Sequence, residues 1–345
     1  MIDKEVYTTN KEFTRLIVHE DFTSTLDSLR ERKIHLGEMG SNSYEAESDF
    51  DLEYGEYELE GITDLLAVSL NPINGEQLNK KIDLLLGYDE SILSFSSLEG
   101  VGVLTSHTLV KLGETDYLPS SLISFHFYTR SRKISEGKTP IKPIENISEA
   151  INKDYSFERG KFIIDNVPNN SILFIDGPLI GKNLSYSTVQ LSNQLLERNI
   201  LAIFIVKNSS SNMVTNKIAS LKGIYNSDLH WAFTHLKCGQ RTNFFMYRDK
   251  IHHDFAKFFC YMKPFEKSPQ RIEIHPNVYE KFKDNIGDIM DLIYYYYLLN
   301  GTGKNQQMRL IAIAEKFARK TIALFDLKKI LKYTGVTPTV NEERF

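Results

Sequence analysis

Residues 171–206 read SILFIDGPLIGKNLSYSTVQLSNQLLERNILAIFIV, and this stretch predicts the fold. An apolar strand over residues 171–175 is followed by a helix over residues 185–198, with its own apolar period, and by a second apolar strand over residues 200–206. A strand, a helix and a strand at this spacing form a βαβ crossover, whose two strands run parallel. The sequence therefore predicts an α/β core.

A charged residue directly follows each of these two strands. Asp176 stands after the first strand and Lys207 after the second. Because parallel strands end at the same edge of a sheet, both side chains are expected at one rim, where open α/β sheets bind their ligands. The alternative for Asp176 is a structural one, an aspartate in a turn that ends a strand.

Composition narrows the class of protein. The chain has 345 residues, of which 41% are hydrophobic and 25% charged, which is typical of one large or two ordinary globular domains. Its net charge is −4, so no global positive field indicates nucleic-acid binding. The sequence shows no export signal and no apolar run long enough for a membrane span, so we expect a cytoplasmic protein without membrane contact.

The N-terminal part is marked by acidic residues. Eight of them lie close together with no Lys or Arg between them: Glu45, Glu47, Asp49, Asp51, Glu53, Glu56, Glu58 and Glu60. The alternation in DFDLEY and EYELE predicts two short strands with one acidic face, either a solvated sheet edge or a docking surface for a basic partner. We expect residues 1–85 to be an N-terminal extension with these acidic strands, and residues 86–345 to form the main domain.

Apolar periodicity predicts further helices over residues 147–167, 279–300 and 306–325. Glu158 lies on the first of them. The chain has no P-loop, because GPLIGKN and NGTGKN lack the first glycine and the Ser or Thr after the lysine, and it has no GxSxG or HExxH motif. Carboxylates on a strand end and a nearby helix favour Mg²⁺ or Mn²⁺ and phosphodiester hydrolysis, with Lys207 neutralising the phosphate.

Four segments, SILFIDGPL, IFIVKNSSSN, RIEI and RLIAIAEKFARKT, occur in the order in which the NurA nuclease family has similar motifs. The chain resembles that family from about Ser91 to Leu331, most clearly between Glu158 and Asn212. The resemblance implies an RNase H-like fold: a mixed sheet flanked by helices, here with an N-terminal extension and C-terminal helices. It also implies a Mn²⁺- or Mg²⁺-dependent DNA nuclease that acts as a homodimer with a HerA-type hexameric ATPase, in DNA repair by end processing or in antiviral defence.

The resemblance also assigns residues. The aspartate of the family's Asp-Gly-Ser/Pro-Leu motif falls on Asp176 and the helix glutamate on Glu158, which are the expected metal ligands. The lysine and serine of the family's strand-end motif match Lys207 and Ser209, expected to contact phosphate. Arg271 belongs to an Arg-x-Glu strand that ends on Glu273, where a substrate contact and a structural ion pair are both open.

Two positions depart from the family pattern. The first strand of the family ends in Asp-Gly-Ser, and the nearest match is Glu99-Gly100, which makes Glu99 the third expected metal ligand. The family's Ala-His-Glu motif aligns with Ala314-Glu315-Lys316, so Glu315 takes a catalytic position normally held by histidine. A glutamate can bind a divalent ion but cannot transfer protons at neutral pH as imidazole does. The alternatives are therefore a catalytically lapsed subunit that grips DNA, and an RNase H-like nuclease that works without a motor.

Overall fold

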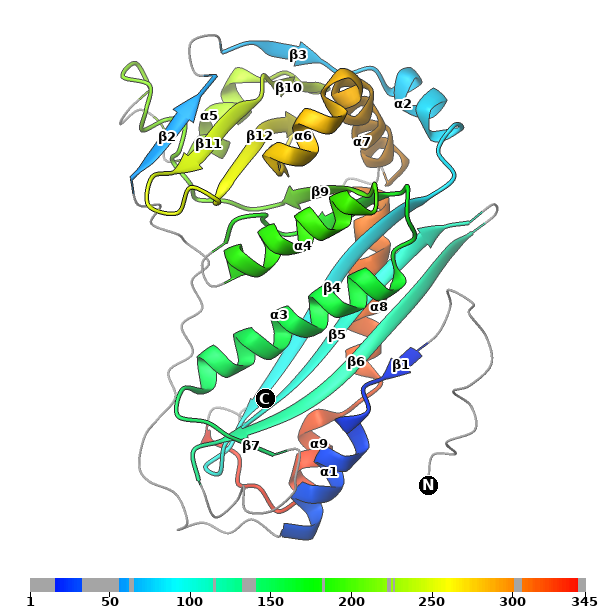
Figure 1. Cartoon of the computed structure of the whole chain (residues 1–345), viewed down its shortest axis with the longest axis vertical. Coiled ribbons are helices and arrows are strands. Elements are labelled where there is room, and N and C mark those ends of the chain that lie inside the picture. Colours follow the sequence, from blue (N-terminus) through cyan, green and yellow to red (C-terminus); the bar gives the residue numbers. More distant parts are fainter. Residues whose placement is uncertain are drawn as a thin grey trace. The chain divides into compact units, whose positions relative to one another are not determined.

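The computed structural model describes residues 16–32, 56–61, 65–113, 116–131, 141–181, 184–221, 225, 227–300 and 306–340. The chain forms two compact units, whose elements are labelled in Figure 1. Unit 1 is drawn from Met1–Glu47, Asp89–Phe162 and Ala314–Phe345, and unit 2 from Ser48–Tyr88 and Ile163–Ile313. The predicted division at residue 85, into an extension and a main domain, stays a prediction.

Unit 1 contains a sheet in which β1, β6, β5 and β4 are neighbours in this order. The strands are β1 (Leu16–Val18), β4 (Leu85–Ser96, in unit 1 from Asp89), β5 (Val101–Leu112) and β6 (Tyr117–Thr129). A tight turn joins β4 to β5, and β5 runs antiparallel to β6 along its whole length. The short strand β7 (Lys142–Pro143) and β1 both pair in parallel with β6.

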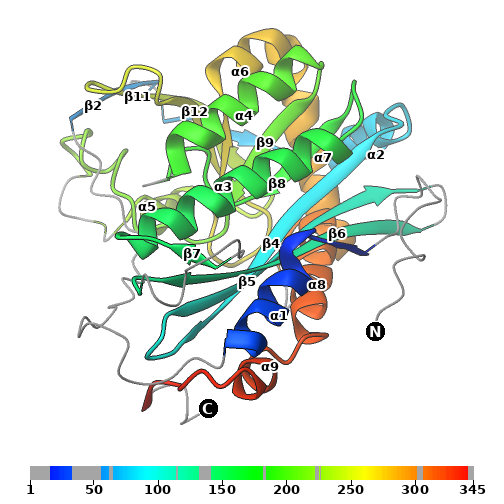
Figure 2. The ribbon, with the colours of Figure 1, turned by 60° about the horizontal axis from the view of Figure 1, so that its bottom comes forward.

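Side chains alternate between the two faces of this sheet, as period two requires. One face packs on α3 (Ile147–Asn166) through Val101, Val103, Tyr128 and Ile147. The other face packs on α1 (Asp21–Arg32), α8 (Arg309–Ala323) and α9 (Leu327–Tyr333) through residues that include Phe22, Leu104, Phe125, Phe127, Ile322 and Leu331. Figure 2 shows these three helices gathered on the side of the sheet away from α3.

Unit 2 contains the predicted βαβ crossover. Strand β8 (Ile172–Asp176), helix α4 (Ser185–Glu197) and strand β9 (Leu201–Val206) follow each other, and β8 pairs with β9 in parallel. Residues 85–88 of β4 pair in parallel with β8 on its other side. The crossover is confirmed, with boundaries within one residue of those expected.

The remaining strands of unit 2 continue this sheet in antiparallel pairs. From β9 the order is β13 (Gln270–Ile274), β12 (Ala256–Lys263), β10 (Gln240–Thr242) and β3 (Ala67–Ser69), while β11 (Phe245–Asp249) links β12 to β2 (Tyr57–Glu60). The predicted strand EYELE is therefore confirmed as β2, with Glu56, Glu58 and Glu60 exposed. Its predicted companion, DFDLEY, lies outside the described residues.

The helices of unit 2 are α2 (Pro72–Asn79), α4, α5 (Asp228–His235), α6 (Pro276–Phe282) and α7 (Ile286–Asn300). The single helix expected over residues 279–300 is wrong, because a 3-10 turn at Lys283–Asn285 separates α6 from α7. Helix α6 begins with His275 as N-cap and Pro276 in the first turn, a typical helix start.

These elements confirm the expected α/β class, a mixed sheet flanked by helices with further helices at the C-terminal end. The N-terminal extension is described only in part. In the described part of the chain, no helix has both the length and the apolar character that crossing a membrane requires.

Candidate functional site

Asp176 and Lys207 meet at the carboxyl ends of β8 and β9. Asp176 is paired with Ile205 of β9, and Lys207 comes two residues later on the same strand end. The Lys207 Nζ lies 2.7 Å from Asp176 Oδ2, with side-chain exposures of 21% and 20%. The topology therefore brings the two predicted rim residues together, and solvent reaches both charges.

The sharp turn after Asp176 depends on Gly177. Its φ of +99° lies in the region that side chains with a Cβ atom disfavour. Its N–H donates to the carbonyl of Ile205 at 2.9 Å, which ties the turn to the neighbouring strand. The Asp-Gly sequence thus ends the strand at once and leaves the Asp176 carboxylate at the rim.

Below the rim, Arg271 and Glu273 form a buried ion pair. Glu273 is fully buried, and its Oε1 lies 2.6 Å from Arg271 Nε and 2.6 Å from Lys257 Nζ. Its Oε2 accepts a 2.8 Å hydrogen bond from the N–H of Leu179, in the loop after Asp176. Burial would raise the pKa of Glu273, but the charges of Lys257 and Arg271 outweigh it and lower the pKa. Of the two readings left open by the sequence, this burial favours the structural ion pair.

Ser209 belongs to the same network. Arg271 is 2% exposed, and its Nη1 donates to the hydroxyls of Ser209 and Ser211 at 2.7 Å each. Among the three residues predicted to contact substrate, Lys207 is the one whose charge lies at the rim. The predicted contacts of Ser209 and Arg271 with substrate stay predictions.

Glu158 lies in unit 1, on the face of α3 that covers β5 and β6. Its side chain is 7% exposed, with Oε1 2.5 Å from His126 Nε2. Its Oε2 accepts hydrogen bonds from Ser124 at 2.6 Å and, more weakly, from Thr105 at 3.4 Å. Burial raises the pKa of Glu158, but hydrogen bonds from His126 and Ser124 and the charge of His126 outweigh it, leaving the pKa at about 2.

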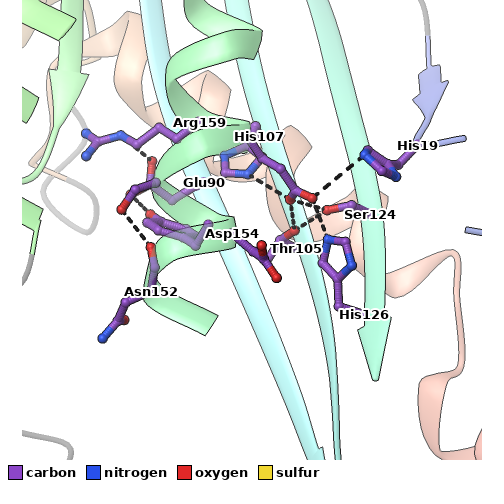
Figure 3. Close-up of polar contacts among 12 residues, drawn as sticks. His19, Glu90, Thr105, His107, Ser124, His126, Asn152, Asp154 and Arg159 are labelled. Carbon is purple, nitrogen blue, oxygen red and sulfur yellow. Dashed lines mark hydrogen bonds and ion pairs between the residues drawn. The ribbon is translucent and has the colours of Figure 1, made fainter. Parts of the chain in front are cut away.

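Two more histidines surround this carboxylate. The Nε2 atoms of His19 and His107 lie 3.9 and 4.0 Å from the oxygens of Glu158. Figure 3 shows the three histidines pointing toward one another: His19 from the end of β1, His107 from β5 and His126 from β6. Burial lowers the pKa of His107 to about 4, although the charges of Glu90 and Glu158 act in the opposite direction. Sequence reasoning missed these histidines because they lie far from Glu158 along the chain.

The two remaining predicted residues lie elsewhere. Glu99 is fully buried in the turn between β4 and β5, where its Oε2 accepts a 2.8 Å hydrogen bond from the N–H of Thr337. The strand from Val101 to Thr105 alone spans about 13 Å, so Glu99 is remote from Glu158. Glu315 lies on α8 and forms a 2.5 Å ion pair with Arg319, one turn along the helix.

A carboxylate that the sequence reasoning missed is Asp89. Tyr88 of β4 is paired with Ile175 of β8, and the residue after Tyr88 is Asp89, just as Asp176 follows Ile175. Asp89 is 5% exposed and accepts a 2.7 Å hydrogen bond from the N–H of Glu90. The signal was available, because Asp89-Glu90-Ser91 keeps the aspartate and serine of the Asp-Gly-Ser pattern at the end of an apolar run.

The expected ligands fit a divalent ion unequally. Within the described residues, no group of three or more His, Cys, Asp and Glu side chains is arranged to hold a metal ion. Asp176 fits, because a carboxylate at a solvent-reached rim offers the oxygen that Mn²⁺ and Mg²⁺ prefer. Glu158 and Glu99 do not fit as they are placed, since both are buried and hydrogen-bonded to protein groups.

Comparisons with solved structures give distant matches. The NurA nuclease from Sulfolobus solfataricus is 11% identical with a TM-score of 0.47, over 78% of this chain and 87% of that one. A NurA structure bound to dAMP and manganese is 10% identical with a TM-score of 0.44, over 78% and 90%. An endonuclease V from Bacillus subtilis is 7% identical with a TM-score of 0.36, over 74% and 84%.

Of the two sequence comparisons, the one with protein-family models gives a match. No curated protein matches the chain. The family model of the NurA domain matches residues 165–319, a range that contains Asp176, Lys207 and the Arg271–Glu273 strand. The resemblance to the NurA family that the sequence motifs indicated is confirmed over this range, where the chain matches the NurA domain model.

Proposed function

We propose that the protein is a nuclease that hydrolyses DNA phosphodiester bonds at the rim of unit 2. The observation that carries the proposal is the ion pair between Asp176 and Lys207, which lies at the strand ends of the matched NurA domain. An ammonium group at a rim can bind a phosphate oxygen and neutralise charge that develops during hydrolysis.

The proposed cofactor is Mn²⁺ or Mg²⁺. Asp176 would hold the ion, which, when bound, would polarise the phosphate and activate a water molecule. Asp89 is our candidate for the first-strand carboxylate, in the role that the sequence reasoning gave to Glu99, although at 5% exposure it, like Glu158, would have to move to reach an ion. Glu158 remains a predicted ligand, although its carboxylate would have to leave His126 to reach an ion.

The partners in this proposal follow from the resemblance. They are DNA, a second copy of the chain and a HerA-type hexameric ATPase, in end processing or defence within the cytoplasm. A motor that threads DNA into the nuclease makes a strongly basic surface unnecessary, which is consistent with the net charge of −4. The exposed acids of β2, Glu56, Glu58 and Glu60, support a docking role for this edge strand.

A second function is favoured by the burial of two predicted ligands. Glu158 and Glu99 are both engaged by protein groups, and Glu315 stands where the family has histidine. A catalytically lapsed subunit that grips DNA through Lys207 would need none of these carboxylates free.

A cleavage assay separates the two functions. Purified protein is incubated with single-stranded and duplex DNA in Mn²⁺, Mg²⁺ or EDTA, with and without the ATPase. The nuclease proposal expects metal-dependent cleavage that is lost in Asp176→Asn and retained in Asp284→Asn, which changes an exposed aspartate of the same unit. DNA binding without cleavage under every condition favours the lapsed subunit.

The same assay tests the first-strand carboxylate. Asp89→Asn is expected to lower the cleavage rate at least about 100-fold, whereas Glu99→Gln keeps it within about threefold, because Glu99 holds a turn rather than substrate. A large loss of cleavage in Glu99→Gln and little loss in Asp89→Asn would assign the role to Glu99 and not to Asp89.

A further inference from the structure

Two loops follow the strands that carry the Asp176 site. The first loop comes after β8 and contains Leu179, which is fully buried and whose N–H donates to Glu273 Oε2 at 2.8 Å. The second comes after β9 and contains Ser209 and Ser211, whose hydroxyls each accept a 2.7 Å hydrogen bond from Arg271 Nη1. Both loops are therefore held by side chains of β13.

The two residues that hold them are joined to each other. Arg271 and Glu273 are separated by one residue on β13, so period two places them on the same face of the sheet. Arg271 is paired with Val206 and Glu273 with Phe204, which sets them directly beside the end of β9. The 2.6 Å contact between Arg271 Nε and Glu273 Oε1 completes a continuous path from one loop to the other.

We propose that Arg271 and Glu273 are positioning residues that tie the loop after β8 to the loop after β9 and so set the geometry of Asp176 and Lys207. The inference rests on the proposed function for the consequence in catalysis, while the tie itself concerns only the fold. In this positioning role Arg271 and Glu273 contact neither substrate nor ion, and the predicted contact of Arg271 with substrate is a separate prediction. They act through the two loops.

The chemistry of arginine makes this tie specific. One guanidinium group donates in two directions, from Nε to Glu273 and from Nη1 to the serines. Lysine presents a compact point charge and cannot bridge two separated partners in the same way. A lysine at position 271 would keep the positive charge near Glu273 but would lose the hydrogen bonds to Ser209 and Ser211 in the loop after β9.

The neighbouring Lys257 adds a second cation to the ion pair. Lys257, Arg271 and Glu273 together carry a net charge of +1, and all three are buried. Removing Glu273 alone would leave two buried cations facing each other, which destabilises the fold strongly. The double variant Lys257→Met/Glu273→Leu keeps the net charge of +1 and removes the acceptor of the Leu179 N–H.

The test measures hydrogen exchange in the two loops and cleavage kinetics in the same variants. Arg271→Lys and Ser209→Ala/Ser211→Ala are expected to speed hydrogen exchange in the loop after β9 about tenfold. Lys257→Met/Glu273→Leu is expected to do the same in the loop after β8. Exchange in β8 and β9 themselves should not change. Thr234→Ala is the matched control, since Thr234 bonds to Trp231 within α5 and lies outside the tie. In the loop variants kcat is expected to fall at least about tenfold, with KM changing less than about threefold.

The outcomes separate the tie from the proposed function. Faster loop exchange in a protein that never cleaves DNA would support the tie and overturn the nuclease proposal. Unchanged loop exchange in all three variants would overturn the tie, whatever the cleavage rates. Faster exchange throughout the sheet would contradict it as well, because the residues would then be general supports of the fold.

Discussion

Asp176 and Glu158 were predicted as metal ligands from the same kind of evidence, but they lie in opposite environments. Asp176 is 20% exposed at a strand end, beside one ammonium group. Glu158 is 7% exposed in the middle of a helix, with His126, Ser124 and Thr105 around its oxygens. The comparison teaches that a motif fixes where an acid sits along an element, whereas exposure and neighbours decide what that acid can bind.

The cause of the difference is local. A strand that ends in Asp-Gly puts its last side chain at the edge of a sheet, with Gly177 turning the chain away. A glutamate in the middle of α3 faces a sheet instead, and the residues that rise from β5 and β6 to meet it are polar. The first carboxylate is available to a ligand, and the second serves the packing of α3.

The largest expected effect on stability comes from removing the buried contact between His126 and Glu158. His126→Leu leaves the Glu158 carboxylate buried without its main partner, and we expect it to lower the free energy of unfolding by about 3–5 kcal/mol. Lys207→Met, which breaks the partly exposed pair of Asp176 and Lys207, is expected to lower it by a smaller amount, about 1 kcal/mol. Chemical denaturation of the two variants measures both values. Equal losses would show that exposure does not separate the two sites.

Acid should affect unit 1 through His107. Its pKa in the folded chain is about 4, below the unfolded value near 6.5, so the unfolded chain takes up the proton first. Stability is therefore full above about pH 6.5 and falls by at most about 3 kcal/mol as the pH drops to about 4. The depressed pKa of Glu158, about 2, continues the loss as carboxylates of the unfolded chain protonate below about pH 4.5.

Hydrogen exchange in peptides of β5 and β6, followed from pH 7 to pH 3 with correction for intrinsic rates, measures this slope. His107→Gln should flatten it between pH 6.5 and pH 4 and leave the loss below pH 4 in place. A slope that persists in His107→Gln would mean that another group takes up the proton.

A smaller effect is expected at the rim, where Lys207 is proposed to bind the phosphate. Lys207→Met is expected to lower kcat/KM for DNA cleavage about 100-fold, or about 2.7 kcal/mol, because a charged donor to the phosphate is lost. Lys217→Met is a suitable control, since Lys217 lies in the same unit over the ring of Tyr57. An unchanged kcat/KM in Lys207→Met would remove Lys207 from the chemistry and leave it as a partner of Asp176.

The smallest effect concerns the turn that exposes Asp176. Gly177→Ala meets no atom within 4 Å of the added Cβ, so its cost comes from the φ of +99° alone, about 1–2 kcal/mol of stability. Gly160→Ala, in the middle of α3 and equally free of contacts, should instead stabilise by about 0.5–1 kcal/mol. Thermal denaturation of the pair gives the two signs. A stabilising Gly177→Ala would contradict the left-handed turn.

The sequence allowed the crossover and the rim to be predicted, because their signals are local. Apolar runs and helical periodicity located β8, α4 and β9, and parallel pairing then placed Asp176 and Lys207 together. The surroundings of Glu158 could not be predicted in this way. Its partner His126 lies 32 residues away on strand β6, and no local pattern reveals such a contact.

Glu99 shows a different limit. It was chosen because Glu99-Gly100 resembles Asp-Gly, but the strand β4 ends at Ser96 and the glutamate lies in the turn beyond it. Asp89, inside the strand, keeps the aspartate and the serine of Asp-Gly-Ser, with a glutamate in place of the glycine, and was not predicted. Short motifs with one substitution could be placed only when strand pairing was known.

The most direct test of the central claim is the rate of DNA cleavage in Mn²⁺ by wild type, Asp176→Asn and Glu158→Gln, each shown to be folded. We predict that Asp176→Asn loses cleavage by at least about 1000-fold, while Glu158→Gln, whose carboxylate is held by His126, loses less cleavage than Asp176→Asn. Cleavage by Asp176→Asn at the rate of wild type would contradict the assignment of the rim of unit 2 as the catalytic site.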